Sequence, residues 1–233
     1  MDMLTVITCP SRRLQYTEAT LDGLDRAGAD TCTRLVCCDG PPEGPEGSLA
    51  QICRWPIAIK PDGPSGTRFI MWWTFRKALE YGADRLLYCE DDLIVSRDAV
   101  HKIRAMDIDD EHAFITFYDW KECPDPRTAA GLYTAPAMGF HNDGLYGSQC
   151  LLIPRRTIEW VTTRNADEWG DPWPHTKNGG DCVLTWAIRQ SPWPRFAVHV
   201  PSLVDHAGVT SSIEPRRVRR SSQYIESMGG TRG

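Results

Sequence analysis

Arg85-Leu86-Leu87-Tyr88-Cys89-Glu90-Asp91-Asp92-Leu93-Ile94 joins a mostly apolar run to three consecutive carboxylates. The apolar run suits a short strand that is buried on both faces of a mainly parallel sheet. In such sheets ligands bind at the carboxyl ends of the strands, where these acids would lie. Three adjacent acids repel one another, and their oxygen atoms favour a hard cation such as Mg²⁺ or Mn²⁺. A solvated acidic turn before a helix capped by Ser96 is the alternative interpretation.

Composition describes an ordinary globular protein. The chain has 233 residues, 41% of them hydrophobic and 24% charged, which suits one large domain. A net charge of −5 argues against a surface that coats nucleic acid non-specifically. No apolar stretch is long enough to span a membrane, and the N-terminus lacks a signal-type core. Nine cysteines with no CxxC pair argue against a disulfide framework and a zinc site.

Strand and helix patterns alternate along the chain. A strand at 4–9, a helix at about 14–28 and a strand at 34–39 open an α/β domain with a parallel sheet. Further helices are expected at about 68–81, 97–106, 156–164 and 181–190, and further strands at 113–118, 147–153 and 196–200. We expect loops where proline and glycine are frequent, at residues 40–47, 119–146 and 165–180.

Polar groups follow several of these strands. Residues 8–13, 39–40, 90–92 and 201–212 would therefore meet at one edge of the sheet. A metal ion with several hydrogen-bond donors at that edge suits a nucleoside diphosphate.

At this point the sequence resembles the GT-A glycosyltransferase fold. The first strand is followed by Pro10 and arginine, the second ends at Asp39, and Glu90-Asp91-Asp92 resembles the DxD motif with Glu in first place. Residues 146–153 look like the strand that follows in many members. Residues 201–212 are similar to the closing "PSL-x-x-H-x-G-x-x-SS" element of eukaryotic N-acetylglucosaminyltransferases that branch N-glycans.

The resemblance implies a single GT-A (Rossmann-like) α/β domain over 1–212, with a mainly parallel central sheet and helices on both faces. A basic tail would occupy 213–233. Asp92 would bind Mn²⁺ (or Mg²⁺) directly, His206 would be a further metal ligand, and Glu90 would bind the metal through water or hold the ribose. A solvated loop histidine is the alternative for His206. The residues implied for the nucleotide-sugar donor are Thr8, Pro10, Arg12, Arg13, Asp39, Glu90, Asp91, Ser211 and Ser212.

Inverting sugar transfer also requires a base for the acceptor hydroxyl. Asp181 follows two glycines at a helix start and resembles the catalytic Asp of inverting GT-A enzymes, although Asp is also a common N-cap. Asp119, Asp143 and Asp171 are the other candidates for the base.

The donor suggested by the resemblance is a UDP-sugar, and the acceptor is either a hydroxymethylated pyrimidine in phage DNA or a bacterial glycan. Trp120, Trp169 and Trp173 lie in expected loops and could stack on sugars or bases. We expect a soluble cytoplasmic protein (in the host cytoplasm if phage-encoded) with no membrane span. The sugar and the oligomeric state stay open.

Two other functions compete with this one. A nucleotidyltransferase acting on sugar phosphates would also use carboxylates and a metal, but residues 9–13 lack the glycines that its phosphate loop usually has. A catalytically inactive module that binds a nucleotide or carbohydrate is the other alternative.

Overall fold

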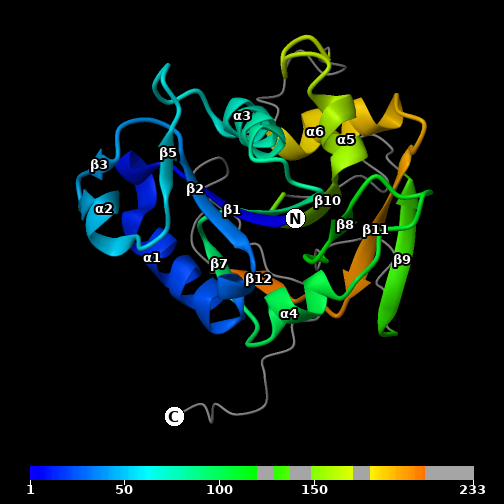
Figure 1. Cartoon of the computed structure of the whole chain (residues 1–233), viewed down its shortest axis with the longest axis horizontal. Coiled ribbons are helices and arrows are strands. Elements are labelled where there is room, and N and C mark those ends of the chain that lie inside the picture. Colours follow the sequence, from blue (N-terminus) through cyan, green and yellow to red (C-terminus); the bar gives the residue numbers. More distant parts are fainter. Residues whose placement is uncertain (120–128, 137–147, 170–178, 208–233) are drawn as a thin grey trace, which may run out of the picture.

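The computed structural model describes residues 1–119, 129–136, 148–169 and 179–207 and centres on an eight-stranded sheet (Figure 1). Its strand order is β5-β2-β1-β6-β10-β8-β11-β9. The bounds are β1 Asp2–Thr8, β2 Thr33–Cys38, β5 Ile57–Ile59, β6 Arg85–Cys89, β8 Ile115–Thr116, β9 Gly131–Pro136, β10 Cys150–Pro154 and β11 Arg195–Val200. Only β9 and β10 run against the other strands of this sheet. The expected mainly parallel sheet is confirmed.

Helices cover both faces of the sheet, as expected. Helices α3 (Thr67–Glu80), α5 (Arg155–Val161) and α6 (Gly180–Arg189) lie on one side in Figure 1, and α1 (Pro10–Arg26) and α4 (Ala99–Arg104) lie on the other. Side chains alternate along β1 accordingly. Met3 and Ile7 join the core beneath α3, whereas Leu4 and Val6 join the core beneath α1.

Smaller elements complete the described fold. They are η1 (Ala29–Thr31), α2 (Leu49–Ile52), the β3 (Glu43–Gly44) and β4 (Gly47–Ser48) pair, and the β7 (Leu93–Val95) and β12 (Val204–His206) pair. None of the helices in the described ranges has the length and apolar character needed to cross a membrane.

The structure corrects three local expectations. Helix α1 starts at Pro10 rather than near residue 14, because proline at a first helical position already has the helical φ angle. Strand β9 lies within the expected loop 119–146, where its pairing with β11 supplies the hydrogen bonds that its sequence pattern did not reveal. The expected loop 40–47 contains the β3–β4 pairing.

Candidate active site

The carboxyl ends of β1, β2, β5 and β6 lie side by side because these strands are parallel neighbours. Thr8 ends β1, Asp39 follows β2, and Glu90 follows β6. Strand β10 is antiparallel to β6, so its first residues return to the same edge. The topology therefore brings together polar residues that lie far apart in the sequence.

Asp92 and His206 meet through the pairing of β7 with β12. His206 lies opposite Leu93 in this pair, and the Ala207 amide donates to the Asp92 carbonyl at 2.9 Å. His206 Nε2 consequently lies 3.2 Å from Asp92 Oδ2, and both side chains are 7% exposed. The alternative of a solvated loop histidine is wrong, since His206 is buried in a strand.

The segment before His206 is tied to the sheet. The Ser202 hydroxyl accepts a hydrogen bond from the Asp119 amide at 2.9 Å, and the Leu203 amide donates to the Phe117 carbonyl at 3.1 Å. These bonds fix the approach of β12 to β7. The histidine is thus held by backbone pairing along its whole segment.

The donor atoms of Asp92 and His206 fit one divalent cation. Neighbouring ligands of an octahedral cation, each about 2.1 Å from it, lie roughly 3 Å apart. The separation of 3.2 Å between Oδ2 and Nε2 is that of a direct contact between imidazole and carboxylate, and it is also compatible with two neighbouring ligands of one cation. Within the described ranges no group of three or more His, Cys, Asp or Glu side chains is arranged to hold a metal. Phosphate oxygens and water would complete the coordination, as is usual for Mg²⁺ in phosphate sites.

Glu90 faces the same region from the end of β6. Its Oε1 accepts a hydrogen bond from the Ser148 hydroxyl at 2.6 Å, and its amide donates to the Gln149 carbonyl at 2.9 Å. Burial, followed by the negative charge of Asp92, raises the pKa of Glu90 to about 7, and the charges of Asp181 and His206 also act on it. These four ionisable groups are therefore close enough to interact.

Asp91, the middle acid, is held by threonines of the scaffold. Its Oδ2 accepts hydrogen bonds from the hydroxyls of Thr8 at 2.7 Å and Thr17 at 3.0 Å. The Thr20 hydroxyl donates to the Asp91 carbonyl at 2.9 Å and accepts from the Leu93 amide at 2.9 Å. The donor-binding roles of Thr8 and Asp91 stay predictions, and the contacts shown here anchor the acidic segment to β1 and α1.

Asp39 is buried and holds the loop that leads into α3. Its carboxylate accepts from the Ser65 amide at 3.0 and 3.1 Å, the Ser65 hydroxyl at 3.1 Å and the Gly66 amide at 3.0 Å. Pro64 of this loop lies over Gly40, where an added Cβ would meet Pro64 Cγ at 2.8 Å. Recognition of the nucleobase or ribose by Asp39 stays a prediction.

Asp181 lies in the first turn of α6, whose N-cap is Gly179. The expectation that Asp181 is itself the cap is therefore wrong: the cap lies two residues earlier, and Asp181 Oδ1 accepts from the Cys182 amide at 2.9 Å. A Cβ on Gly179 would lie 2.5 Å from Asp181 Oδ1, and a Cβ on Gly180 would lie 2.9 Å from Met71 Cε. Gly180 thus allows α6 to dock closely on α3, and Gly179 leaves room for the Asp181 carboxylate.

Comparison with known proteins shows the fold. No protein-family model matches the sequence, and no curated protein matches it. Among solved structures, S. aureus TarS 1-349 superposes with a TM-score of 0.54 at 13% identity, over 87% of this chain and 59% of that one. A glycosyltransferase involved in the glycosylation of the major capsid of PBCV-1 superposes with a TM-score of 0.52 at 13% identity. The match covers 90% of this chain and 94% of that one. The glycosyltransferase GlyE of Streptococcus pneumoniae TIGR4 superposes with a TM-score of 0.50 at 13% identity, over 81% of this chain and 43% of that one.

The chain has the GT-A fold. Identities of 13% establish the architecture alone, and the chain spans 59% of TarS 1-349.

Part of the expected GT-A site lies outside the described residues. This holds for Ser211, Ser212, Asp143, Asp171, Trp120 and Trp173, and for the side chains of Arg12 and Arg13. Pro10 is buried at the first position of α1.

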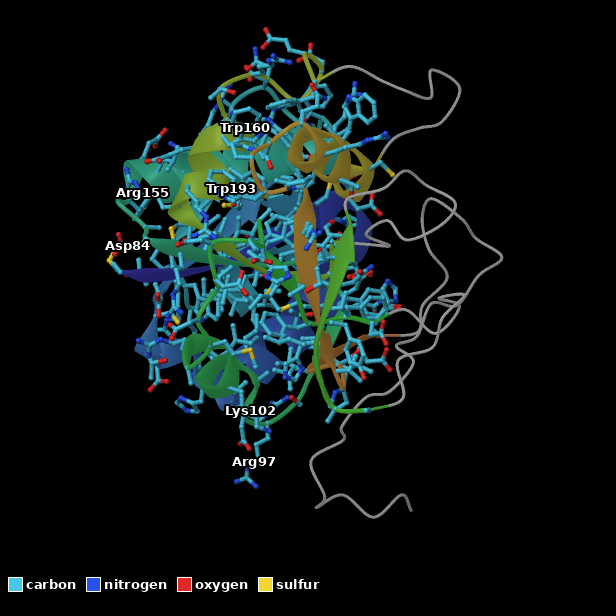
Figure 2. All side chains as sticks on the ribbon, turned by 90° about the vertical axis from the view of Figure 1, so that its right-hand side faces the viewer. Asp84, Arg97, Lys102, Arg155, Trp160 and Trp193 are labelled. Carbon is cyan, nitrogen blue, oxygen red and sulfur yellow. The ribbon has the colours of Figure 1, made fainter. Side chains whose placement is uncertain are left out.

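Trp169 is a core residue, so the suggestion that it stacks on a ligand is wrong. It is 3% exposed, and its indole N–H donates to the Val161 carbonyl at 2.9 Å. Its ring packs against Trp160, which Figure 2 shows with Trp193 on the α5 side of the sheet.

Sequence reasoning did not single out four residues that shape this edge of the GT-A domain: Ser148, Thr17, Thr20 and Lys60. Ser148 lies near the start of the segment 146–153, which was identified as a following strand, so its place at the carboxyl edge could have been inferred from an antiparallel pairing. The spacing of Thr17 and Thr20 puts them on one face of α1, although no local pattern shows that this face meets the acidic segment.

Proposed function

We propose that this chain is a metal-dependent glycosyltransferase that moves a sugar from a nucleotide-sugar donor to an acceptor hydroxyl. The observation that carries the proposal is the buried pair of Asp92 Oδ2 and His206 Nε2, 3.2 Å apart at the end of β6. A carboxylate and an imidazole at this edge of a GT-A fold suit a cation that is shared with a diphosphate.

The residues divide the chemistry between them. A divalent cation at Asp92 and His206 would neutralise the charge that develops on the diphosphate as the sugar departs. Imidazole favours Mn²⁺ over Mg²⁺ as that cation. Ser148 orients Glu90 toward the same region. Asp181 takes the proton of the acceptor hydroxyl, which makes the transfer inverting.

The donor that we propose first is a UDP-sugar. Two acceptors are proposed, a hydroxymethylated pyrimidine in DNA and a glycan, and the experiment below tests both. The likeness to a glycosyltransferase involved in capsid glycosylation supports the glycan arm. The basic residues 213–233, which would be compatible with a DNA acceptor, lie outside the described residues. We propose the cytoplasm as the place of action.

The testing experiment measures unfolding of the protein with nucleoside diphosphates and nucleotide sugars, each with Mn²⁺, with Mg²⁺ and with a chelator. A nucleotide at about 100 times its dissociation constant should stabilise the fold by about 2.7 kcal/mol, and only when metal is present. Release of nucleoside diphosphate is then followed with each acceptor. Absence of stabilisation by every nucleotide would contradict the proposal, whereas binding without sugar transfer to either acceptor would favour the binding module.

A further inference from the structure

Lys60 is a buried cation at the same edge of the sheet. It directly follows β5, and its amide donates to the Cys38 carbonyl at 2.9 Å, which continues the parallel pairing with β2. The residue is 8% exposed. It therefore lies beside Asp39, at the end of the sheet where a GT-A domain meets its ligand.

The contacts of the Lys60 ammonium are long. Its Nζ lies 3.5 Å from the Gly63 carbonyl oxygen and 3.8 Å from a carboxylate oxygen of Asp62, whose side chain is 84% exposed. Asp39 forms no ion pair with it, since the Asp39 carboxylate accepts from Ser65 and Gly66 instead. Burial of an ammonium is unfavourable unless close acceptors replace water. Lys60 therefore has capacity to donate to a further acceptor.

The position of Lys60 limits which part of a donor could supply that acceptor. Strand β5 is three strands away from β6 in the sheet, which is roughly 14 Å at about 4.8 Å per strand. Asp39, which the sequence resemblance implied for the nucleobase and ribose, lies beside Lys60. With a diphosphate near Asp92 and His206, the nucleoside would be the part of the donor that extends toward Asp39, so the base is the group that we assign to Lys60.

We propose that Lys60 reads the nucleobase of the donor by donating to its exocyclic carbonyl oxygen. This inference rests on the proposed glycosyltransferase function. Lysine has three donors and no acceptor, so it suits O4 of uracil or O6 of guanine. Cytosine and adenine present an amino group at the corresponding position, and that group cannot accept the bond. The selected donors therefore carry uracil or guanine.

The test compares dissociation constants of UDP, GDP, CDP and ADP with Mn²⁺ present. The unmodified protein should bind UDP or GDP at least about tenfold more tightly than CDP and ADP. The comparison of UDP with GDP then shows whether uracil or guanine is the favoured base. Lys60→Met should weaken the favoured nucleotide by about ten- to a hundredfold, the range for a hydrogen bond to a charged group. Binding of CDP and ADP should change less than about threefold.

Two further variants complete the design. Lys102→Met is the matched control, because Lys102 is a partly exposed lysine on α4 that pairs with Asp98, and Figure 2 shows it at the opposite end of the molecule from Trp160. Its base preference should equal that of the unmodified protein. The side-chain amide of Lys60→Gln can accept as well as donate a hydrogen bond, so the dissociation constants of UDP and CDP should become more similar. This variant keeps the inference testable even if Lys60→Met fails to fold.

The outcomes separate this inference from the proposed function. If Lys60 only holds the loop at 61–66, both Lys60 variants will weaken all four nucleotides equally, and the inference is overturned. Equal binding of the four nucleotides to the unmodified protein overturns it as well. Failure of all four to bind with either metal would instead reject the proposed function on which it rests.

Discussion

The three consecutive acids have different partners, although they are chemically alike. Asp92 is directed at His206, Asp91 is directed at Thr8 and Thr17, and Glu90 bonds to Ser148. The backbone bends at Asp91 and Asp92, between β6 and β7. The Asp91 carboxylate therefore bonds to β1 and α1, whereas Asp92 meets His206 of β12. The first and third acids are therefore the two that we propose for ligand chemistry, and the middle acid secures the segment that carries them.

Replacing either proposed metal ligand should weaken the metal-dependent binding of nucleotide. We expect Asp92→Asn and His206→Gln each to weaken Mn²⁺-dependent binding of the nucleotide by about tenfold or more, because a neutral amide replaces the carboxylate or the imidazole as ligand. Isothermal titration with and without Mn²⁺ measures the effect. Asp98→Asn and His101→Gln on the α4 side are the controls. Unchanged binding in both ligand variants would remove the metal assignment.

Replacement of the proposed base should separate binding from chemistry. Asp181→Asn keeps the size of the side chain, so nucleotide affinity should stay within about twofold. Its kcat should fall by about 10²–10⁴, the usual contribution of a general base. Steady-state kinetics on the identified acceptor gives both values, with exposed Asp167→Asn as the control. Full activity of Asp181→Asn would transfer the role to another acid, first of all Asp119.

At the residue scale, the sequence predicted which edge of the sheet would gather these polar residues better than it predicted each contact. The acids after β6 were named from their pattern, whereas His206 was named from the resemblance of residues 201–212 to a family's closing element. Their 3.2 Å approach depends on the β7–β12 pairing, which joins segments far apart in sequence. Similarly, nothing local to Asp39 indicates that Ser65 and Gly66 bond its carboxylate.

At the scale of elements, α1 acts as a support for the acidic segment. Thr17 and Thr20 are fully buried, and together with Thr8 of β1 they bond Asp91 and Leu93. The Thr17 hydroxyl also lies 2.7 Å from that of Thr8. The helix consequently sets where the segment 90–93 lies relative to the sheet.

Loss of one hydroxyl from this support should affect both stability and ligand binding. Thr17→Val leaves Asp91 with one donor fewer, so we expect the free energy of unfolding to fall by about 1–3 kcal/mol. Mn²⁺-dependent nucleotide affinity should fall with it, because the acids lose their fixed position, and Thr17→Ser should restore both. Urea unfolding and titration calorimetry provide the two measurements.

The matched control for that experiment lies elsewhere in the core. Thr157 of α5 is also fully buried, and its hydroxyl donates to the Ala113 carbonyl at 2.6 Å. Thr157→Val should destabilise the protein similarly without changing nucleotide affinity. Equal loss of affinity in both variants would show that the threonines of α1 act only through general stability.

Elements with strong local patterns were the predictable ones. Strands β1, β2, β6 and β11 fall within a few residues of their expected positions because apolar runs mark them. Strand β9 was missed because it is an edge strand with mostly exposed or partly buried residues, so burial imposes little pattern on it. Its existence depends on pairing with β11, which is a tertiary effect.

At the scale of the whole molecule, the two ends of the parallel strands carry different kinds of polar group. The carboxyl end gathers groups that would meet a ligand. The opposite end holds Asp2, whose carboxylate accepts from Arg85 Nε at 2.9 Å, Arg85 Nη2 at 2.8 Å and Arg104 Nε at 3.0 Å. This cluster joins β1, β6 and α4, so it contributes to the fold at a distance from the candidate site.

The cluster should make stability depend on pH in the acid range. Hydrogen bonds from Arg85, followed by those from Arg104, hold the pKa of Asp2 below its usual value of 3.8. A carboxylate whose pKa is lower in the folded state stabilises the fold above the unfolded pKa, and that contribution is lost as pH falls through the folded pKa. Asp2→Asn should therefore lower the free energy of unfolding by about 1–3 kcal/mol at neutral pH. The difference from the unmodified protein should shrink below about pH 4.

Urea unfolding at a series of pH values measures this difference, with Asp98→Asn, at the exposed N-cap of α4, as the control. Because Asp2 lies at the end of the sheet opposite the candidate site, Asp2→Asn should leave Mn²⁺-dependent nucleotide affinity unchanged at neutral pH. A constant difference down to the most acidic point would contradict the assigned direction of the pKa. A loss of nucleotide affinity in Asp2→Asn would instead show that the two ends of the sheet are coupled, and that the site depends on the packing of β1 against β6 along its whole length.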